Sequence, residues 1–223
     1  MEHYAIIGDI KASKAISNRA AVQDRLGAVL ESVNQIYSRD IAANFLITLG
    51  DEFQGLLHDR TNLIEITKYI QRRMYPVGIR FGIGIGEITT DIRREAAIGA
   101  DGPAFYAARA IIEEIHDQEK KLKRQAPDIQ IAFYGKKPGD LCFRLTEINT
   151  LLSLTKVIED DWTEKQRLTI WDMMENKGSQ EMCAKRMGTT QPTVARRLAE
   201  GKYTVYTNAL SVIEEAVRKL GEQ

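Results

Sequence analysis

The sequence has few of the residues that stabilise secreted proteins or anchor proteins in membranes. Only two of its 223 residues are cysteines, Cys142 and Cys183, and their spacing fits neither a disulfide framework nor a metal motif. No apolar run approaches the roughly 18 residues that a membrane span requires, and the N-terminus has no signal-peptide pattern. We therefore expect a cytoplasmic protein without a membrane partner.

The sequence also has no excess charge of either sign. Its 31 lysine and arginine residues balance its 31 aspartate and glutamate residues. Such a protein has no overall attraction for a polyanion, so a nucleic-acid surface, if present, must be local. The apolar fraction of 43% is sufficient for one large core, or for a medium domain with a smaller one.

Residues 1–145 alternate between strand-like and helix-like patterns. Apolar residues at spacings of three and four predict helices at about 17–36, 62–74 and 103–122. Short apolar or alternating runs predict strands at 3–9, 77–88 and 129–134, and a hairpin at 43–58. This order, βαββαβ with an added strand, predicts an α+β fold: a ferredoxin-like antiparallel sheet with helices on one face.

The predicted hairpin carries two carboxylates at its tip, in the sequence LITLGDEFQGLL at 46–57. In a ferredoxin-like sheet the first strand lies beside the third, so Asp9 should meet Asp51 at one sheet edge. We expect Glu52 to point across the strand, away from them. Asp9 and Asp51 are then either an ordinary turn and helix approach, or carboxylates that require a cation between them.

The segment VGIRFGIGIGEI at 77–88 has apolar side chains on one face and mostly glycines on the other. A glycine-lined strand indicates that something approaches closely, either a packed helix or a ligand. Because the glycines lie inside the strand, they are not a dinucleotide-binding fingerprint.

The C-terminal region contains the pattern of a helix-turn-helix, and we predict such a domain at 161–223, after a linker helix at 146–160. In SQEMCAKRMGTTQPTVARRL, at 179–198, Ala184 suits a helix crossing, Gly188 a left-handed turn, and Val194 the core between two helices. Thr190 is a suitable N-cap for the second helix. The open alternative is a three-helix bundle that makes protein contacts.

Side chains suited to DNA contact lie around the second of these helices. The five basic residues between Lys185 and Lys202, less the single acid Glu200, give a local charge of 5 − 1 = +4. Glutamine can read adenine, and arginine can read guanine or bind phosphate. The candidate residues for binding duplex DNA are Gln191, Thr193, Arg196, Arg197 and Lys202.

The segments IIGDIKAS, TLGDEFQGLL, VGIRFGIGIGEI and DGPAFYAARAI together resemble the palm domain of class III nucleotidyl cyclases, and more faintly diguanylate cyclases. The whole chain, with its C-terminal motif, resembles the SatD family. The cyclase resemblance implies that Asp9 and Asp51 hold Mg²⁺ and that Arg109 contacts a nucleotide. The sequence departs from the cyclases at Phe105, where they have an asparagine, and at Ile47, where they have a purine-reading lysine.

Two functions follow from these patterns. The first is a DNA-binding transcriptional regulator with a degenerate cyclase-like domain for sensing or dimerisation. The alternative is a metal-dependent enzyme that binds or processes a nucleotide, although the two departures predict that it does not form a cyclic product.

Because the second helix of one helix-turn-helix reads only half of a DNA site, we expect a homodimer. Its contact would come from the cyclase-like domain or from the apolar residues of the last helix, Val205, Leu210, Ile213, Val217 and Leu220.

Overall fold

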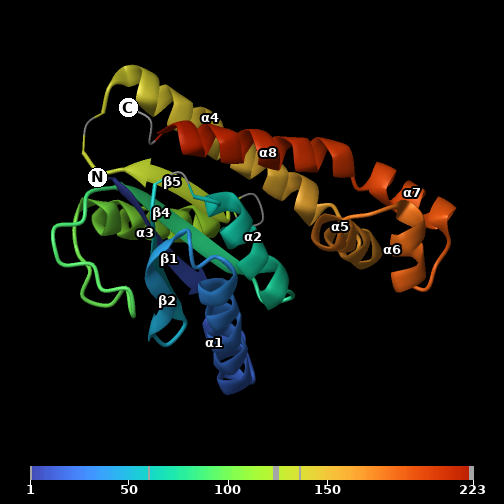
Figure 1. The fold of residues 1–223 in the computed structure, drawn as a ribbon, viewed down its shortest axis with the longest axis horizontal. Coiled ribbons are helices and arrows are strands. Elements are labelled where there is room, and N and C mark those ends of the chain that lie inside the picture. The colour runs from blue at the N-terminus through green and yellow to red at the C-terminus, as the bar shows by residue number, and fades with distance from the viewer. Residues whose placement is uncertain (1, 60, 123–125, 136, 221–223) are drawn as a thin grey trace. The chain divides into compact units, whose positions relative to one another are not determined.

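The computed structural model describes residues 2–59, 61–122, 126–135 and 137–220 (Figure 1). They form two compact units: an N-terminal unit of residues up to Ser153 together with those from Ile213 onward, and a helical unit of Leu154–Val212. Two helices, α4 (Gly139–Asp160) and α8 (Tyr203–Leu220), have residues in both units. The predicted division at 145 and 160 therefore differs from this one, because α4 begins earlier and the end of α8 belongs to the N-terminal unit.

The N-terminal unit is built on a five-stranded sheet in the order β2–β3–β1–β4–β5. The strands are β1 (His3–Ile10), β2 (Ile41–Leu49), β3 (Glu52–Leu57), β4 (Ile79–Gly86) and β5 (Ile129–Phe133). The α+β class and the placement of β1 beside β3 agree with the prediction. The sheet is mixed, however, because β5 pairs with β4 in parallel, as a helical crossover between two strands allows.

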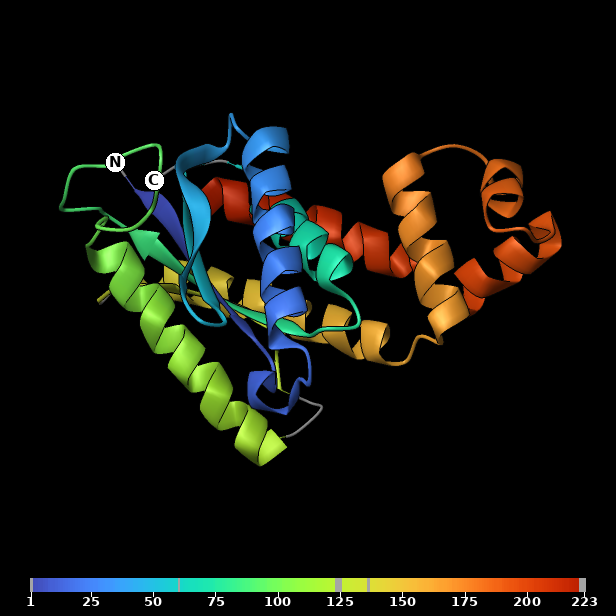
Figure 2. The ribbon, with the colours of Figure 1, turned by 90° about the horizontal axis from the view of Figure 1, so that it is seen from below.

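Helices cover both faces of this sheet, whereas the sequence predicted helices on one face only. Helix α3 (Pro103–Leu122) lies on one side, and α1 (Arg19–Ile36) and α2 (Leu63–Met74) lie on the other (Figure 2). A single turn of 3₁₀ helix, η1 (Ser13–Ala15), follows β1. Every residue of β4 is buried, which agrees with a strand covered on both faces.

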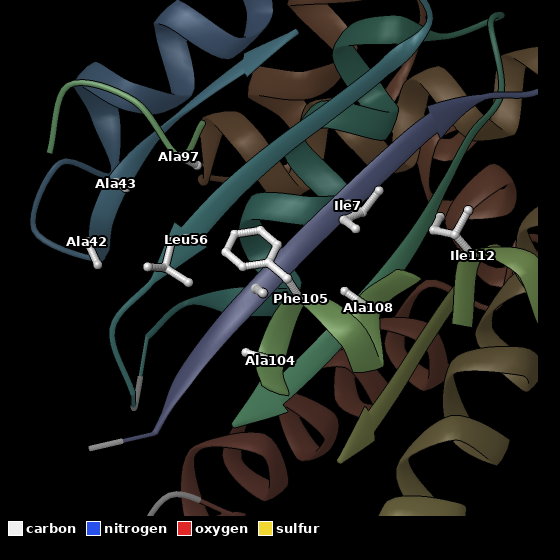
Figure 3. Close-up of a cluster of buried hydrophobic side chains, with 10 residues drawn as sticks. Ile7, Ala42, Ala43, Leu56, Ala97, Ala104, Phe105, Ala108 and Ile112 are labelled. Atoms are coloured by element: carbon white, nitrogen blue, oxygen red, sulfur yellow. The ribbon is translucent and has the colours of Figure 1, made fainter. Parts of the chain in front are cut away.

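The glycines of β4 let α3 approach the sheet. A Cβ atom at Gly84 would lie 1.8 Å from the carbonyl oxygen of Ala104, and one at Gly82 would lie 2.4 Å from that of Ala108. Figure 3 shows Phe105 and Ala108 of α3 packed over Ile7 of β1 in the buried cluster at this contact. Of the two explanations for the glycine-lined face, the packed helix is therefore the one found.

The helical unit has its own core. Its complete helices are α5 (Glu164–Asn176), α6 (Gln180–Arg186) and α7 (Gln191–Glu200). Helix α5 begins with a capping box between Thr163 and Gln166. The buried residues of this core are Trp162, Ile170, Cys183, Ala184, Val194, Leu198 and Tyr206.

The last turns of α8 pack within the N-terminal unit. Ile213, Val217 and Leu220 are buried, and the Tyr4 hydroxyl donates a hydrogen bond to the Val217 carbonyl oxygen at 2.9 Å. These three residues are therefore covered by the chain itself, which corrects their predicted availability for a dimer contact. None of the helices in the described ranges is long and apolar enough to cross a membrane.

Candidate functional site

A hollow of about 470 Å³ opens where β1, the β2–β3 turn, β4 and α3 meet. Asp9 and Asp51 both line it, so the structure brings together the two carboxylates that the topology predicted would converge. The turn between β2 and β3 is closed by Gly50 in a left-handed conformation, with φ of 64°. The backbone amide of Ile10 donates to the carbonyl oxygen of Asp51 at 3.2 Å, which fixes the turn against the end of β1.

Asp9 is held by two groups from other elements. Its Oδ2 atom lies 3.7 Å from Nη1 of Arg80, its direct partner on β4, and 3.1 Å from Nε2 of His116 on α3. Burial raises the pKa of Asp9, while the nearby Arg80 charge and the His116 hydrogen bond oppose this rise and the Asp51 carboxylate adds to it. The protonation of Asp9 is therefore set by burial together with Arg80, His116 and Asp51.

Arg80 is the most deeply buried charged group of the hollow, with 3% of its surface exposed. Its Nη2 atom lies 3.2 Å from the Glu119 carboxylate on α3, while Nε and Nη1 are buried without a hydrogen-bond partner among the described residues. Arg80 alternates with Gly82 and Gly84, so it lies on the glycine-lined face of β4, where its charge offsets the Asp9 and Glu119 carboxylates.

Glu52 lines the same hollow, contrary to the expectation that it points away. Asp9 and Glu52 are directly opposite each other on β1 and β3, and opposite residues in an antiparallel pair share a face of the sheet. Arg109 of α3 neutralises this third carboxylate, because its Nη1 lies 2.6 Å from Glu52 Oε2. Arg109, the predicted nucleotide contact, also lines a second hollow of about 450 Å³ beside α3, together with Tyr106.

His116 is the residue of this site that sequence reasoning missed, since the three histidines show no ligand spacing. A signal did exist: His116 follows Ile112 by four residues and Arg109 by seven, so all three lie on one stripe of α3. Recognising it required knowing that α3 covers the face of β1 that carries Asp9. At the position where cyclases have an asparagine, Phe105 is buried in the core of Figure 3.

The oxygen donors of the hollow are of the type that Mg²⁺ prefers. Nevertheless, the described part of the chain contains no group of three or more His, Cys, Asp or Glu side chains placed to hold a metal ion. Asp9 is engaged by Arg80 and His116, and Glu52 by Arg109. Asp9 and Asp51 could hold Mg²⁺ only if Asp9 released its contacts with Arg80 and His116, and the remaining ligands would come from water or from phosphate.

The second candidate surface lies on α6 and α7 of the helical unit. Gly188 takes the left-handed conformation, with φ of 60°, and Ala184 and Val194 are buried between the helices. The amide of Thr189 donates to the carbonyl oxygen of Ala184 at 2.9 Å. Thr190 occupies the N-cap position of α7 without a side-chain capping bond, because its hydroxyl pairs with that of Thr193 at 2.9 Å.

The predicted DNA contacts differ in their exposure. Gln191 and Arg196 are exposed at the start and on the outer face of α7, and Gln191 donates to the Gln180 side-chain oxygen at 2.7 Å. Arg197 is half-buried and donates to the Thr169 hydroxyl at 3.3 Å. Lys202 is exposed, with Nζ 3.8 Å from an Asp161 carboxylate oxygen.

One part of the predicted basic patch is neutralised within the unit. Arg186 binds the Asp172 carboxylate of α5 through two nitrogens, at 2.9 Å and 2.6 Å. This bidentate pair lowers the pKa of Asp172 by hydrogen bonding to its charged form. The basic surface that remains available is therefore centred on Lys185 and Arg196, both exposed.

Comparisons with known proteins gave one family match and several structural neighbours of low sequence identity. A model of the SatD family matches residues 3–216, while a search among curated proteins gave no match. The solved structure of the guanylyl cyclase Cya2 is 12% identical over 51% of this chain and 70% of its own, with a TM-score of 0.37. A bacterial light-regulated adenylyl cyclase is 13% identical over 59% of this chain and 43% of its own, with a TM-score of 0.41. A regulator of polyketide synthase expression from Bifidobacterium adolescentis is 13% identical over 99% of this chain and 80% of its own, with a TM-score of 0.28.

Proposed function

This chain belongs to the SatD family, and we propose that it is a DNA-binding regulator whose helix α7 enters the major groove of duplex DNA. The observation that carries this proposal is the arrangement of α6 and α7. Gly188 turns the chain, Ala184 and Val194 bury the crossing, and Gln191 and Arg196 are left exposed on α7. In a helix-turn-helix, the second helix lies in the major groove and its N-terminal polar residues contact the base edges.

The chemistry of the exposed residues supports this role. Gln191 donates one amide hydrogen to Gln180, which leaves its other amide hydrogen and its carbonyl oxygen for a base. A donor next to an acceptor matches the N6 and N7 edge of adenine in the major groove. Arg196 follows five residues later and carries a charge suited to guanine or to a phosphate.

The side chains of the five predicted contacts differ in the bonds that they make within the helical unit. Arg197 is half-buried against Thr169, so we assign it a mainly structural part in holding α7 on α5. Thr193 pairs with Thr190. The direct contacts we propose are therefore Gln191 and Arg196, with Lys202 near the phosphate backbone.

The experiment that tests this function is selection of genomic fragments by the purified full-length protein, followed by binding titrations. We expect enriched fragments to share a sequence, and the affinity for a selected duplex to exceed that for a scrambled duplex. The affinity should also fall as salt is raised, since each neutralised phosphate releases counterions. If no fragment is enriched and neither duplex binds at low salt, the proposal is wrong.

We further propose that the protein acts as a homodimer, since one α7 would contact only half of a DNA site. Ile213, Val217 and Leu220 are buried in the chain, so the contact must involve other surfaces. Light scattering with and without a selected duplex tests this proposal, and a monomer mass in both conditions would contradict it.

A second candidate function is binding of a nucleotide with Mg²⁺ in the hollow of the N-terminal unit. The observation that favours it is the convergence of Asp9, Asp51 and Glu52 beside a buried Arg80 whose Nε and Nη1 have no hydrogen-bond partner in the described structure. Such a site combines oxygen donors for a cation with a guanidinium that can bind phosphate. A bound nucleotide would make this unit a sensor for the DNA-binding unit.

A further inference from the structure

Helix α2 receives its N-terminal cap from a residue about 150 positions later in the chain. Its own N-cap residue, Asn62, makes no side-chain capping bond and instead donates to the Asp40 carboxylate. The amides of Ile64 and Glu65, in the first turn of α2, donate to Oε2 of Glu214 at 3.1 Å and 3.0 Å. These amides have no partner within α2, so Glu214 satisfies them.

Glu214 lies on the part of α8 that belongs to the N-terminal unit, Ile213–Leu220, which we call the α8 end. The α8 end is also attached by its buried apolar residues and by the bond from Tyr4 to Val217. Arg218 donates to the Asn62 side chain, which adds a second contact at the start of α2. The contacts that order the first turn of α2 are therefore also contacts that attach the α8 end to the N-terminal unit.

The ionised form of Glu214 is poorly satisfied in this position. Its second oxygen, Oε1, is buried without a hydrogen-bond partner among the described residues. Burial raises the pKa of Glu214 to about 7, and the Glu65 carboxylate acts in the same direction, while the two amides and Arg218 oppose the rise. Arg218 on α8 and Glu65 on α2 are the charged groups that act on it.

We propose that Glu214 makes attachment of the α8 end to α2 a pH-responsive contact, strongest when its carboxyl group is protonated. The detached segment would expose Glu214 to water, where its pKa is 4.5. Attachment is then strongest below pH 4.5, weakens as the pH rises towards 7, and stays at its weakest value above that. Helix α8 follows α7 in the chain and begins in the helical unit. The Glu214 contact therefore couples the order of the first turn of α2 to the helix that leads out of the helical unit.

Hydrogen exchange of the full-length protein between pH 5 and pH 7.5, corrected for the intrinsic pH dependence of exchange, tests this proposal. In the wild type, peptides covering 61–67 and 211–220 should lose protection together, with local opening increasing roughly tenfold or more over this range. Glu214→Gln keeps the carbonyl acceptor but cannot ionise, so its protection should stay constant between the two pH values.

The matched control is Glu215→Gln, which changes the exposed neighbour that pairs with Lys219 on the same helix. This variant should keep the full pH response of the wild type. A wild type whose two peptides show no pH-dependent loss overturns the proposal without any variant. A Glu214→Gln protein that retains the wild-type response overturns it equally. Neither result depends on DNA binding, so both are separate from a failure of the proposed function.

Discussion

Asp9 and Arg80 are direct cross-strand partners on β1 and β4, and their charged groups lie 3.7 Å apart under helix α3. Arg80 also contacts Glu119 of α3, so one buried guanidinium connects the sheet to the helix that covers it. Arg80 therefore compensates the negative charge of both Asp9 and Glu119.

Replacing Arg80 with methionine should lower the free energy of unfolding by about 1 to 3 kcal/mol, because the partly buried carboxylates of Asp9 and Glu119 lose their hydrogen-bonding and charged partner. Urea denaturation at neutral pH measures this loss. The double variant Arg80→Met with Asp9→Asn should recover part of it, since one unpaired carboxylate is then removed. Equal stability of wild type and single variant would show that Arg80 does not compensate these carboxylates.

The pKa of Asp9 should move in opposite directions in two variants. His116→Ala removes a hydrogen bond and a positive charge that lower the pKa, so it should rise further, whereas Asp51→Asn removes a negative charge and should lower it. Because the folded pKa lies above the ordinary 3.8, the stability that Asp9 contributes is complete below pH 3.8 and is lost as the pH rises through the folded value. His116→Ala should therefore extend this loss to higher pH. Carboxyl carbon NMR titrations measure both shifts, and movement in the same direction would contradict this account.

Gly84 should not tolerate a side chain. A Cβ atom there would lie 1.8 Å from the Ala104 carbonyl oxygen, so Gly84→Ala should force α3 off the sheet and prevent stable folding or cost several kcal/mol. Gly27→Ala, on α1, meets nothing within 4 Å and should raise stability by up to about 1 kcal/mol through helix propensity. Thermal unfolding of the two variants compares them, and a Gly84→Ala protein as stable as wild type would mean that α3 does not pack this closely.

Arg196→Ala should weaken binding to a selected duplex by about 1 to 3 kcal/mol, with little change in stability, because the side chain is exposed. Arg197→Ala should weaken binding and also destabilise the helical unit, since it loses the contact with Thr169. Lys165→Ala, an exposed basic residue on α5, is the control for a general loss of positive charge. If Arg196→Ala and Lys165→Ala have the same effect in anisotropy titrations, α7 makes no specific contact.

Mg²⁺ with ATP or GTP should raise the unfolding temperature of the wild type if the hollow binds a nucleotide. A ligand at a hundred times its dissociation constant adds about 2.7 kcal/mol of stability. Asp51→Asn should reduce this shift, and we expect no cyclic product because Phe105 and Ile47 replace the groups that the cyclases use. The absence of a shift across a nucleotide panel would rule out this second function, and formation of a cyclic nucleotide would overturn the expectation about catalysis.

Local patterns in the sequence determined the order of the strands and helices and the turn between α6 and α7. Apolar periodicity predicted the order of strands and helices, because side chains repeat every two residues in a strand and about every 3.6 in a helix. The left-handed turn at Gly188, with Ala184 and Val194 buried beside it, follows from residue size and backbone freedom. The approach of Asp9 to Asp51 followed from strand topology alone.

Only the tertiary structure decided which helix covers which face of the sheet, because a periodic pattern defines an apolar face and not its partner. Placing α3 over the glycines of β4 is what brings His116 to Asp9 and Arg109 to Glu52. The same holds for Glu214, whose contact with α2 joins positions about 150 residues apart. Such contacts depend on how complete elements pack, and the local sequence does not encode their partners.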